Sequence, residues 1–446
     1  MSSYVTKQSP GDTSWFVADR FGMFIHFGLY SLPARHEWIK SYQLISEEKY
    51  DLYFKHFNPD LCDPKEWAKK AKAAGMKYAV LTTKHHEGFC LFDSQYTDYK
   101  VTNTQYKKDL VREFVDAFRA EGIRIGFYYS LIDWHHPQFP IDWIHPRRCD
   151  DNAEQLNEGR DIKVYAEYMR NQLTELMTNY GKIDILWFDF SYTRRPQEID
   201  PATNMWLPKD WMQGKGKDEW ESEKLIALVR KLQPDIIIND RAAIDQDLYT
   251  PEQFTPTEWV KHKETGELVT WEACHTFSGS WGYHRDEMSW KTPEMLIQML
   301  INIVSCGGNL IMNVGPTARG CFDSRADKAL DVFADWMKYN SRSIYNCTMA
   351  EPEFVAPRGC RFTQSTDGKR LYVHLIEYPI SHLELKGFAG KVEYVQFLHD
   401  ASEILFIENE FTLIGNVVSS GDDILVLQIP AIRPDVIVPV IEIFLK

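Results

Sequence analysis

The sequence Ile183-Asp184-Ile185-Leu186-Trp187-Phe188-Asp189-Phe190 has the pattern of a buried β-strand that ends in aromatic residues and one carboxylate. Strands this apolar belong to parallel α/β folds, in which helices cover both faces of the sheet. A carboxylate at the C-terminal end of such a strand points into the mouth of a barrel, where these folds carry their chemistry. An Asp among Trp and Phe is costly to bury without a function or a partner. We therefore interpret Asp189 as a catalytic nucleophile.

Short apolar runs alternate with amphipathic helical stretches from residue 20 to about 340, which predicts βα units and a parallel sheet. The candidate strands are Met23–Phe27, Tyr78–Thr83, Arg124–Ser130, Ile183–Phe190, Asp235–Asp240, Thr270–His275 and Asn309–Val314. This number of units favours a somewhat irregular (β/α)8-like, TIM-type barrel over a doubly wound sheet. No GxGxxG motif follows the first strand, so a dinucleotide-binding fold has little support. The polar stretch 191–219 is expected to be an insertion after the fourth strand.

The pattern changes near residue 350, where short alternating apolar and polar runs follow one another without helices between them. Short strands in close succession indicate a β-sandwich. We therefore expect two domains, a catalytic barrel over residues 1–348 and a C-terminal β-sandwich over residues 349–446.

Charge and cysteine usage restrict the partners and the compartment. The 446 residues carry a net charge of −14, which argues against nucleic acids and anionic membrane surfaces as partners. No apolar run is long enough to span a bilayer, and the first residues lack the apolar core of a secretion signal. The eight cysteines are scattered without a CxxC pair, which suits reduced thiols. These features predict a cytoplasmic protein.

Polar and aromatic residues gather where the predicted strands end, strand after strand, and packing alone does not explain this. They are His26, Glu37, Trp38, His85, His86, Tyr129, Trp187, Asp189, Arg241, Glu252, Glu272 and Trp281.

Three of these residues also allow other interpretations. His85 and His86 could be metal ligands, but adjacent residues of a strand point to opposite faces and rarely reach one ion. Hydrogen bonds to sugar hydroxyls are the better use for them. Arg241 could form a structural ion pair with Asp240, although in this setting we favour a role in positioning a catalytic carboxyl.

Two carboxyl groups on either side of a scissile bond are the minimal apparatus for glycoside hydrolysis. Asp189, held on a strand, suits the nucleophile. Glu252, in a loop about ten residues past Arg241, suits an acid/base that must reach leaving groups of different shape. Glu272 competes for that role because it also lies in an aromatic setting at a predicted strand end.

Six motifs in sequence order give the chain a specific resemblance. They are Gly22-Met23-Phe24-Ile25-His26-Phe27-Gly28, Glu37-Trp38, Thr83-Lys84-His85-His86-Glu87-Gly88-Phe89, Tyr129-Ser130-Leu131-Ile132-Asp133-Trp134, Leu186-Trp187-Phe188-Asp189 and Ser280-Trp281-Gly282-Tyr283. Over roughly residues 14–345 the chain resembles the α-L-fucosidases of glycoside hydrolase family 29. It departs from the commoner Gly-Ile-Phe-Ile-His-Trp-Gly pattern by having Phe27 in place of Trp.

The resemblance implies an irregular (β/α) barrel with a β-sandwich, and the retaining hydrolysis of terminal α-L-fucose from fucosylated oligosaccharides or glycoconjugates. It implies Asp189 as nucleophile, and as acid/base Glu252, which we prefer to Glu272. It also implies that the sugar hydroxyls are held by His26, Glu37, Trp38, His85, His86 and Tyr129. Trp187 and Trp281 would form the wall around the C5 methyl group, with Arg241 near the acid/base.

The family uses no metal or organic cofactor. The alternatives to a fucosidase are a fucose-binding protein that has lost catalysis and an α-L-galactosidase on the same fold.

Overall fold

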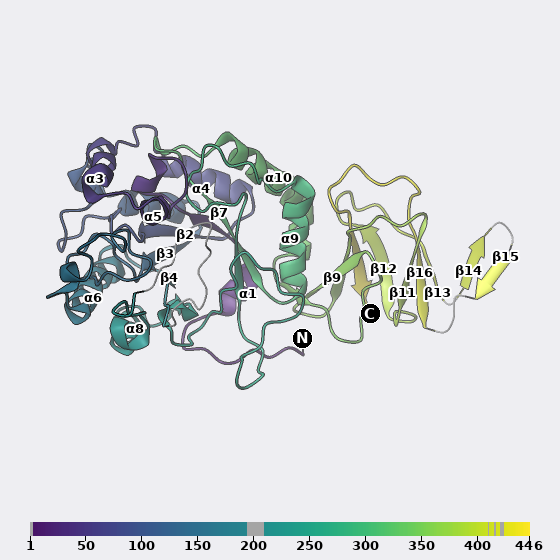
Figure 1. Ribbon diagram of the computed structural model, residues 1–446. Coiled ribbons are helices and arrows are strands. Elements are labelled where there is room, and N and C mark those ends of the chain that lie inside the picture. Colours follow the sequence, from purple (N-terminus) through teal and green to yellow (C-terminus); the bar gives the residue numbers. More distant parts are fainter. Residues whose placement is uncertain (1–2, 194–208, 409, 414–415, 420–422) are drawn as a thin grey trace.

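The computed structural model describes residues 3–193, 209–408, 410–413, 416–419 and 423–446. Figure 1 shows two parts side by side, a parallel sheet surrounded by helices and a set of antiparallel strands that follows it. The insertion expected over 191–219 lies in part outside the described residues, which omit 194–208.

The N-terminal part is built on a seven-stranded sheet in which every pair of neighbouring strands is parallel. Its strands are β1 (Phe21–Ile25), β2 (Tyr78–Lys84), β3 (Arg124–Ser130), β4 (Ile185–Asp189), β5 (Ile237–Ile238), β6 (Glu272–Thr276) and β7 (Asn309–Val314). Their order is β5-β4-β3-β2-β1-β7-β6. All seven expected strands are therefore present, with ends shifted by a few residues.

The seam between the edge strands β5 and β6 is occupied by residues 248–252. Isolated parallel bridges join Leu248 to Asn239, Tyr249 to Trp271 and Glu252 to Cys274. This segment occupies the position of an eighth barrel strand, but isolated bridges and not a regular ladder join it to its neighbours. The predicted irregular (β/α)8-like barrel is confirmed.

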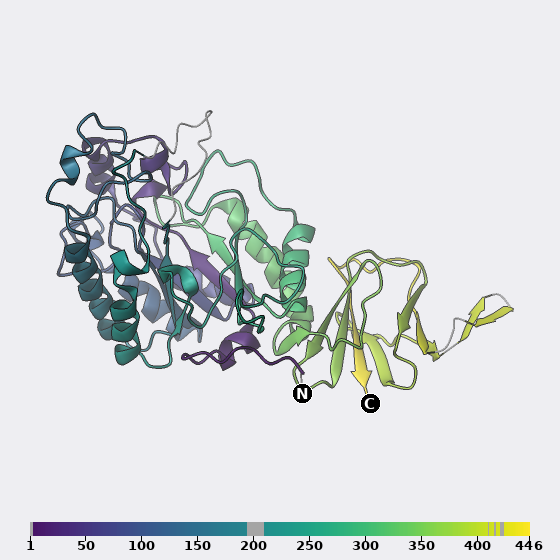
Figure 2. The same ribbon diagram turned by 60° about the horizontal axis from the view of Figure 1, so that its bottom comes forward.

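Helices cover the outside of this sheet (Figures 1 and 2). The longer ones are α3 (Glu47–His56), α4 (Pro64–Ala73), α5 (Leu110–Ala120), α6 (Ile162–Asn179), α8 (Ser222–Leu232), α9 (Pro293–Ser305) and α10 (Ser324–Asn340), and the short ones are α1 (Ser14–Asp19), α2 (Ile39–Tyr42) and α7 (Lys217–Trp220). Several begin at side-chain caps: Asp63, Asp109 and Thr292 each accept a hydrogen bond from a first-turn N–H.

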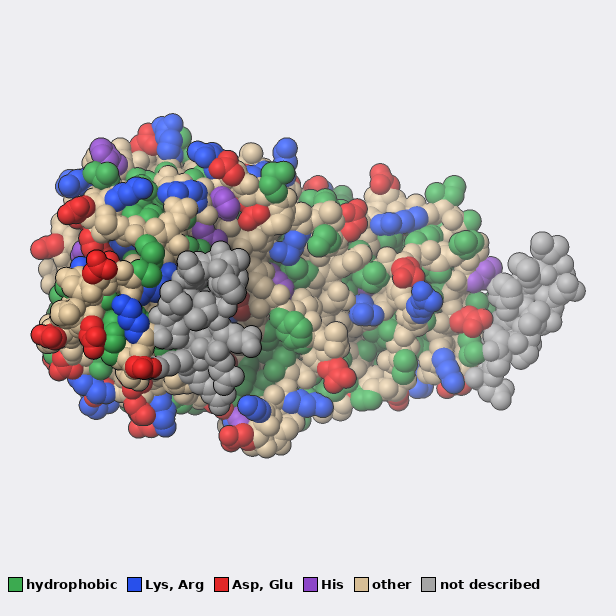
Figure 3. All heavy atoms as spheres, viewed as in Figure 1, with side chains coloured by type: hydrophobic (Ala, Val, Ile, Leu, Met, Phe, Trp, Pro, Cys, Tyr) green, Lys and Arg blue, Asp and Glu red, His purple; other side chains and the backbone are tan. Residues whose placement is uncertain are grey.

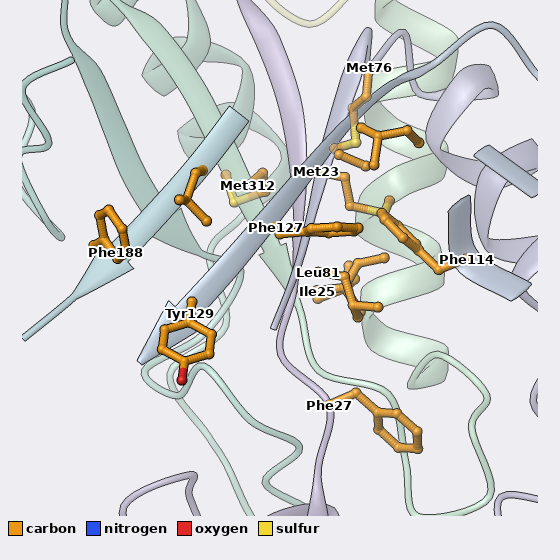
Figure 4. Close-up of a cluster of buried hydrophobic side chains, with 14 of the residues drawn as sticks. Met23, Ile25, Phe27, Met76, Leu81, Phe114, Phe127, Tyr129, Phe188 and Met312 are labelled. Carbon is orange, nitrogen blue, oxygen red and sulfur yellow. The ribbon is translucent and has the colours of Figure 1, made fainter. Parts of the chain in front are cut away.

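Side chains along each strand alternate between two apolar layers. One layer fills the barrel interior and includes Phe24, Tyr128 and Trp187. The other packs between the sheet and the helices, and Figure 4 shows part of it around Phe127 and Tyr129. Which layer a residue joins decides whether it can reach the mouth of the barrel.

The C-terminal part has a five-stranded antiparallel sheet, in the order β12-β17-β10-β9-β8, and a three-stranded one, in the order β11-β16-β13. The strands are β8 (Cys347–Met349), β9 (Cys360–Ser365), β10 (Arg370–Leu375), β11 (His382–Lys386), β12 (Val392–Phe397), β13 (Phe406–Glu408), β16 (Ile424–Gln428) and β17 (Val440–Leu445). A hairpin of β14 (Glu410–Leu413) and β15 (Asn416–Ser419) extends beyond them in Figure 1. The predicted sandwich is confirmed.

The proposed division into 1–348 and 349–446 stays a prediction. Strand β8 spans residue 348 and pairs with β9, so the boundary falls within the first strand of the C-terminal sheet. No helix in the described ranges is long and apolar enough to cross a membrane. Acidic and basic side chains are interspersed on the face shown in Figure 3.

Candidate active site

A cavity opens beside the C-terminal ends of the barrel strands. It is lined by Phe24, His26, Glu37, Trp38, His85, His86, Tyr128, Trp187, Asp189, Phe190, Glu252, Cys274 and Trp281. Most of the residues singled out from the sequence therefore meet at one place. Arg241 lies directly beside them, whereas Tyr129 and Glu272 do not line the cavity.

Asp189 ends strand β4, and its side chain is 13% exposed. Tyr128 donates a hydrogen bond of 2.8 Å to Oδ2, and Nη1 of Arg241 lies 3.1 Å from Oδ1. Burial raises the pKa of Asp189, and the nearby Glu252 raises it too, while Arg241 and the Tyr128 hydrogen bond oppose the shift. The carboxylate is thus held at both oxygens by donors that favour its ionised form.

Arg241 connects the two candidate catalytic carboxylates. Its Nη1 lies 2.7 Å from Oε2 of Glu252 as well as near Asp189, and its Nε donates to Thr250 Oγ1 at 2.9 Å. The guanidinium carbon also lies 4.7 Å from the centre of the Trp187 ring. Arg241 pairs with the two candidate carboxylates and not with Asp240, whose Oδ1 accepts from Thr250 Oγ1.

Local structure explains how the short strand β5 delivers Arg241. The side chain of Asn239 replaces a backbone pair: its Oδ1 accepts from the Phe188 N–H and its Nδ2 donates to the Phe188 carbonyl, both at 2.9 Å. The chain then turns through the 3₁₀ helix Asp240–Ala242, which places Arg241 beside the end of β4.

Two of the cavity histidines have a fixed tautomer. Asn313 donates through Nδ2 to the Trp281 carbonyl, so its Oδ1 faces His26 Nδ1 at 2.6 Å and accepts a hydrogen bond from the Nδ1–H. Ser130 donates to the Ile132 carbonyl and accepts from His86 Nδ1 at 2.7 Å. Burial holds the pKa of both histidines well below the ordinary value, so both rings are neutral.

Glu37 and Trp38 lie in the connection after β1. The Glu37 Oε2 accepts from the backbone N–H groups of Trp281 at 3.1 Å and Gly282 at 2.9 Å. Glu37 thereby ties the loop after β6 to the cavity rim. The Trp38 ring packs against His86 and Phe190 with ring centres 4.9 and 5.0 Å apart.

One wall of the cavity is aromatic. The Phe24 ring lies 5.3 Å from that of Trp187 and 6.0 Å from that of Trp281. These rings present an apolar surface opposite the polar groups contributed by the histidines and Glu37.

Glu272 lies elsewhere. The sequence suggested that it ends a strand, but it begins β6, in register with Asn309, the first residue of β7. It is fully buried, accepting from Tyr78 Oη at 2.5 Å and Trp187 Nε1 at 3.3 Å, and burial raises its pKa to about 8. Glu272 therefore lies in the barrel interior and not at the cavity.

The structure also corrects the choice between two adjacent tyrosines. Tyr129 points away from the cavity into the layer under the helices, where its hydroxyl donates to Gln172 Oε1 at 2.8 Å (Figure 4). Tyr128 faces the cavity because β3 and β4 pair in register, with Tyr128 opposite Trp187. Alternate residues of a strand point to the same face, so Tyr128 lies on the same side of the sheet as Trp187 and Asp189.

Comparisons with known proteins agree with this geometry. The family model described as alpha-L-fucosidase matches residues 3–342. The chain belongs to the α-L-fucosidase family. It is therefore a glycoside hydrolase, and its substrate class is fucosylated glycans. The resemblance, the enzyme class and the retaining α-L-fucosidase function predicted from the sequence are confirmed.

Individual fucosidases show how far the likeness extends. The isoenzyme 1 structure from Paenibacillus thiaminolyticus is 42% identical, with a TM-score of 0.86 over 97% of this chain and 98% of that one. A trapped covalent intermediate of a Bacteroides thetaiotaomicron α-L-fucosidase with 2-fluoro-fucosyl fluoride is 27% identical, with a TM-score of 0.79 over 99% and 98%. Human tissue α-L-fucosidase is 31% identical over 74% of this chain and 69% of its own length.

Sequence reasoning missed several groups of this fucosidase site. Tyr128, Phe24, Phe190 and Cys274 line the cavity, while Asn313 and Ser130 fix two histidines from behind. Tyr128 could have been identified from the alternation of side chains along a strand, given that Asp189 and Trp187 lie on the same face. Within the described part of the chain, no group of three His, Cys, Asp or Glu side chains is arranged to hold a metal ion.

Proposed function

We propose that Asp189 is the nucleophile and Glu252 the general acid/base of this α-L-fucosidase, with Arg241 positioning both. The reaction is the retaining hydrolysis of terminal α-L-fucose. The observation that carries the assignment is the single nitrogen, Arg241 Nη1, within 3.1 Å of Asp189 and 2.7 Å of Glu252. The nearest carboxyl oxygens are therefore no more than about 6 Å apart, which fits the separation of about 5–5.5 Å in retaining glycosidases.

In the first step, Asp189 attacks the anomeric carbon of fucose. A bond forms between its carboxylate oxygen and that carbon, the glycosidic bond breaks, and Glu252 gives its proton to the departing oxygen.

In the second step, water attacks the same carbon and the bond to Asp189 breaks. Glu252 now takes the proton of the water, which regenerates the starting state of both carboxyl groups. Its side chain is 41% exposed, which leaves room for a leaving group and then for water.

The remaining cavity residues have binding roles in this proposal. His26, His85, His86, Glu37 and the indole of Trp38 hold the sugar hydroxyls, and Tyr128 takes the place first given to Tyr129. Trp187 and Trp281, with Phe24, pack on the C5 methyl group, whose burial contributes about 1 kcal/mol.

Labelling tests the nucleophile directly. The native enzyme should become covalently labelled by 2-fluoro-fucosyl fluoride, and peptide mapping by mass spectrometry should find the label on Asp189. Asp189→Asn should lose hydrolysis of an aryl α-L-fucoside by about 10⁴-fold or more while remaining folded. Asp184→Asn is the matched control, since that carboxylate precedes the same strand and accepts from the Ile125 N–H at 2.9 Å, away from the cavity. A label on any other residue would overturn the assignment.

We also propose that the enzyme works in the cytoplasm. The support is that all eight cysteines are free thiols, five of them buried. Fractionation of the source cells, with fucosidase activity followed in each fraction, tests this; activity confined to the medium or to an oxidising compartment would contradict it.

A further inference from the structure

Two consecutive residues at the end of β4, Asp189 and Phe190, both line the cavity. A regular strand does not allow this, because neighbouring side chains point to opposite faces. Trp187 and Asp189 share the cavity side, whereas Phe188 lies in the layer under the helices (Figure 4). Phe190 would join Phe188 if the strand continued. Its φ of +81° ends the alternation and lets its ring lie at the cavity beside Asp189.

This backbone conformation is costly for a residue with a large side chain. The left-handed region favours glycine, and a bulky residue adopts it only where the surrounding structure enforces it. Glycine at position 190 would avoid the cost, yet the chain has phenylalanine there. Strain of this kind collects at functional sites, and here it indicates that the ring itself is needed at the cavity.

The residues on either side of Phe190 are anchored. On one side, Asp189 pairs with Arg241 at 3.1 Å. On the other side, the Ser191 hydroxyl donates to the Arg241 carbonyl at 2.8 Å and accepts from Trp220 Nε1 at 3.0 Å. The left-handed turn at residue 190 is therefore enforced from both sides.

The ring of Phe190 also has fixed supports. Its centre lies 5.0 Å from that of Trp38, 5.5 Å from that of His86 and 5.5 Å from that of Tyr192. Tyr192 in turn donates through its hydroxyl to the buried carboxylate of Asp142 at 2.5 Å. Because its neighbours are held in place, the Phe190 ring is presented to the cavity in one orientation.

Phe190 is one end of a row of three aromatic rings that leads from the cavity to the surface. Trp38 lies in the middle, and its ring stacks on that of Tyr42 with centres 5.7 Å apart and an interplanar angle of 29°. Trp38 is 9% exposed, whereas Tyr42 at the outer end is 39% exposed. The helix α2 that carries Tyr42 is fixed by Ser41, which donates to the Ile144 carbonyl at 2.6 Å.

We propose that the row Phe190–Trp38–Tyr42 binds the sugar to which fucose is attached, and that Phe190 and Tyr42 set the preference for that leaving group. The proposal rests on the fucosidase function above and deepens it. The occupant is a hexopyranoside, because one face of such a ring presents C–H groups that pack on aromatic side chains and are removed from water there.

The exposure of these rings favours the leaving group over fucose as their partner. The departing oxygen must come within reach of Glu252, an exposed residue that lines the same cavity. The sugar on that oxygen therefore lies at the open side of the cavity, where Phe190 is half-buried and Tyr42 is exposed. Residues proposed to hold fucose itself, such as His26 and Trp187, are buried. Stacking on the leaving group acts before and during the reaction alike, so it lowers KM and changes kcat little.

Two substrates with the same fucosyl group test the proposal. α-L-Fucosyl fluoride releases only fluoride, which is too small to stack on the row. The other substrate is the fucosylated disaccharide, from a panel of linkages, that the native enzyme hydrolyses fastest. In Phe190→Ala and in Tyr42→Ala, the ratio of kcat/KM for the disaccharide to kcat/KM for the fluoride should fall by about 10-fold. The change for the disaccharide should appear mainly in KM.

Three further variants separate the ring from the backbone and from general damage. Phe190→Gly relieves the left-handed backbone but still lacks the ring, so it should show the same fall in the ratio as Phe190→Ala. Tyr42→Phe keeps the ring and should keep the native ratio. Tyr339→Ala is the matched control, because this tyrosine is 50% exposed near the end of α10, and its loss should leave the ratio unchanged.

An unchanged ratio in Phe190→Ala or in Tyr42→Ala would overturn the proposal, since equal losses on both substrates mean that the ring supports the fucose pocket or the fold. A native ratio in Phe190→Gly would also overturn it, because the ring would then be dispensable. Failure of the proposed function is a separate result, in which the native enzyme turns over neither substrate.

Discussion

The indole Nε1–H of Trp187 donates to the buried carboxyl of Glu272, 3.3 Å away. Trp187 lines the cavity, while Glu272 lies at the start of β6 inside the barrel. The second candidate acid/base thus contacts a wall of the active site from behind and not the substrate. The raised pKa of Glu272 therefore affects the free energy of unfolding and not the catalytic reaction.

Glu272 should make the enzyme less stable as pH rises. Its pKa in the folded protein is about 8, against an ordinary value of 4.5, so its contribution to stability is complete below pH 4.5 and is lost as pH rises through 8. The free energy of unfolding should fall by about 1 kcal/mol per pH unit in that window. Glu272→Gln removes this pH dependence. The free energy of unfolding of the variant, measured by denaturant titration, should therefore rise relative to that of the native enzyme between pH 5 and 8. Parallel stability curves for the two proteins would show that Glu272 is ionised when folded.

Replacement of Glu252 should strongly reduce the turnover of fucosides, and azide should restore it. Glu252→Ala should lower the turnover of substrates with poor leaving groups by about 10²–10⁴-fold. Azide attacks the fucosyl-enzyme without needing a base, so it should restore turnover of an activated aryl fucoside and yield fucosyl azide. The exposed Glu258, six residues further along the same segment, is the matched control and should tolerate alanine. Rescue of Glu272→Ala in place of Glu252→Ala would reverse the assignment.

The adjacent tyrosines provide a matched pair. Tyr128→Phe removes the hydrogen bond that lowers the pKa of Asp189, so that pKa should rise and the acid limb of kcat/KM should move to higher pH. We expect kcat/KM at neutral pH to fall by about 10-fold. Tyr129→Phe removes only the bond to Gln172 and should leave the pH–rate profile unchanged, at a cost of about 1 kcal/mol in stability. Equal effects of both changes on the profile would contradict this orientation of β3.

The aromatic wall should reject a sugar that carries a hydroxyl on its C5 substituent. We expect kcat/KM for an aryl α-L-fucoside to exceed that for the matching α-L-galactoside by about 10²-fold, because the added hydroxyl would be buried against Trp187 and Trp281 without a partner. Trp281→Leu should narrow this ratio. Trp290→Leu alters a tryptophan that packs on Arg325 outside the cavity, and the ratio should stay the same. A native enzyme that prefers the galactoside would refute the fucose assignment.

The barrel could be predicted because each strand is a recognisable apolar run in the sequence, and the order of the runs along the chain matches β1 to β7. The depth at which a given side chain lies within the barrel could not be predicted. Glu272 was expected to end a strand in an aromatic setting, but it begins β6. The apolar run showed that a strand is present here and did not show at which end of it this carboxyl lies.

The face of a strand was equally hard to predict. Tyr128 and Tyr129 have the same chemistry, and only pairing with β4 decides which of them shares a side with Asp189. Partners supplied by distant segments, such as Asn313 behind His26, have no local signature. The residues that touch the cavity were largely identifiable from the sequence, whereas those that orient them emerged only from the packing.

Asp189 and Glu252, the two proposed catalytic groups, are anchored differently in the barrel. Asp189 ends a strand with neighbours paired on both sides, while Glu252 lies on a segment joined to its neighbours by isolated bridges and not by a regular ladder. Insertions or exchanges around residues 248–252 can therefore reshape the region that accepts the departing alcohol and leave the sugar pocket intact. Evolution, or a protein engineer, can alter which glycans are trimmed without rebuilding the machinery that recognises fucose.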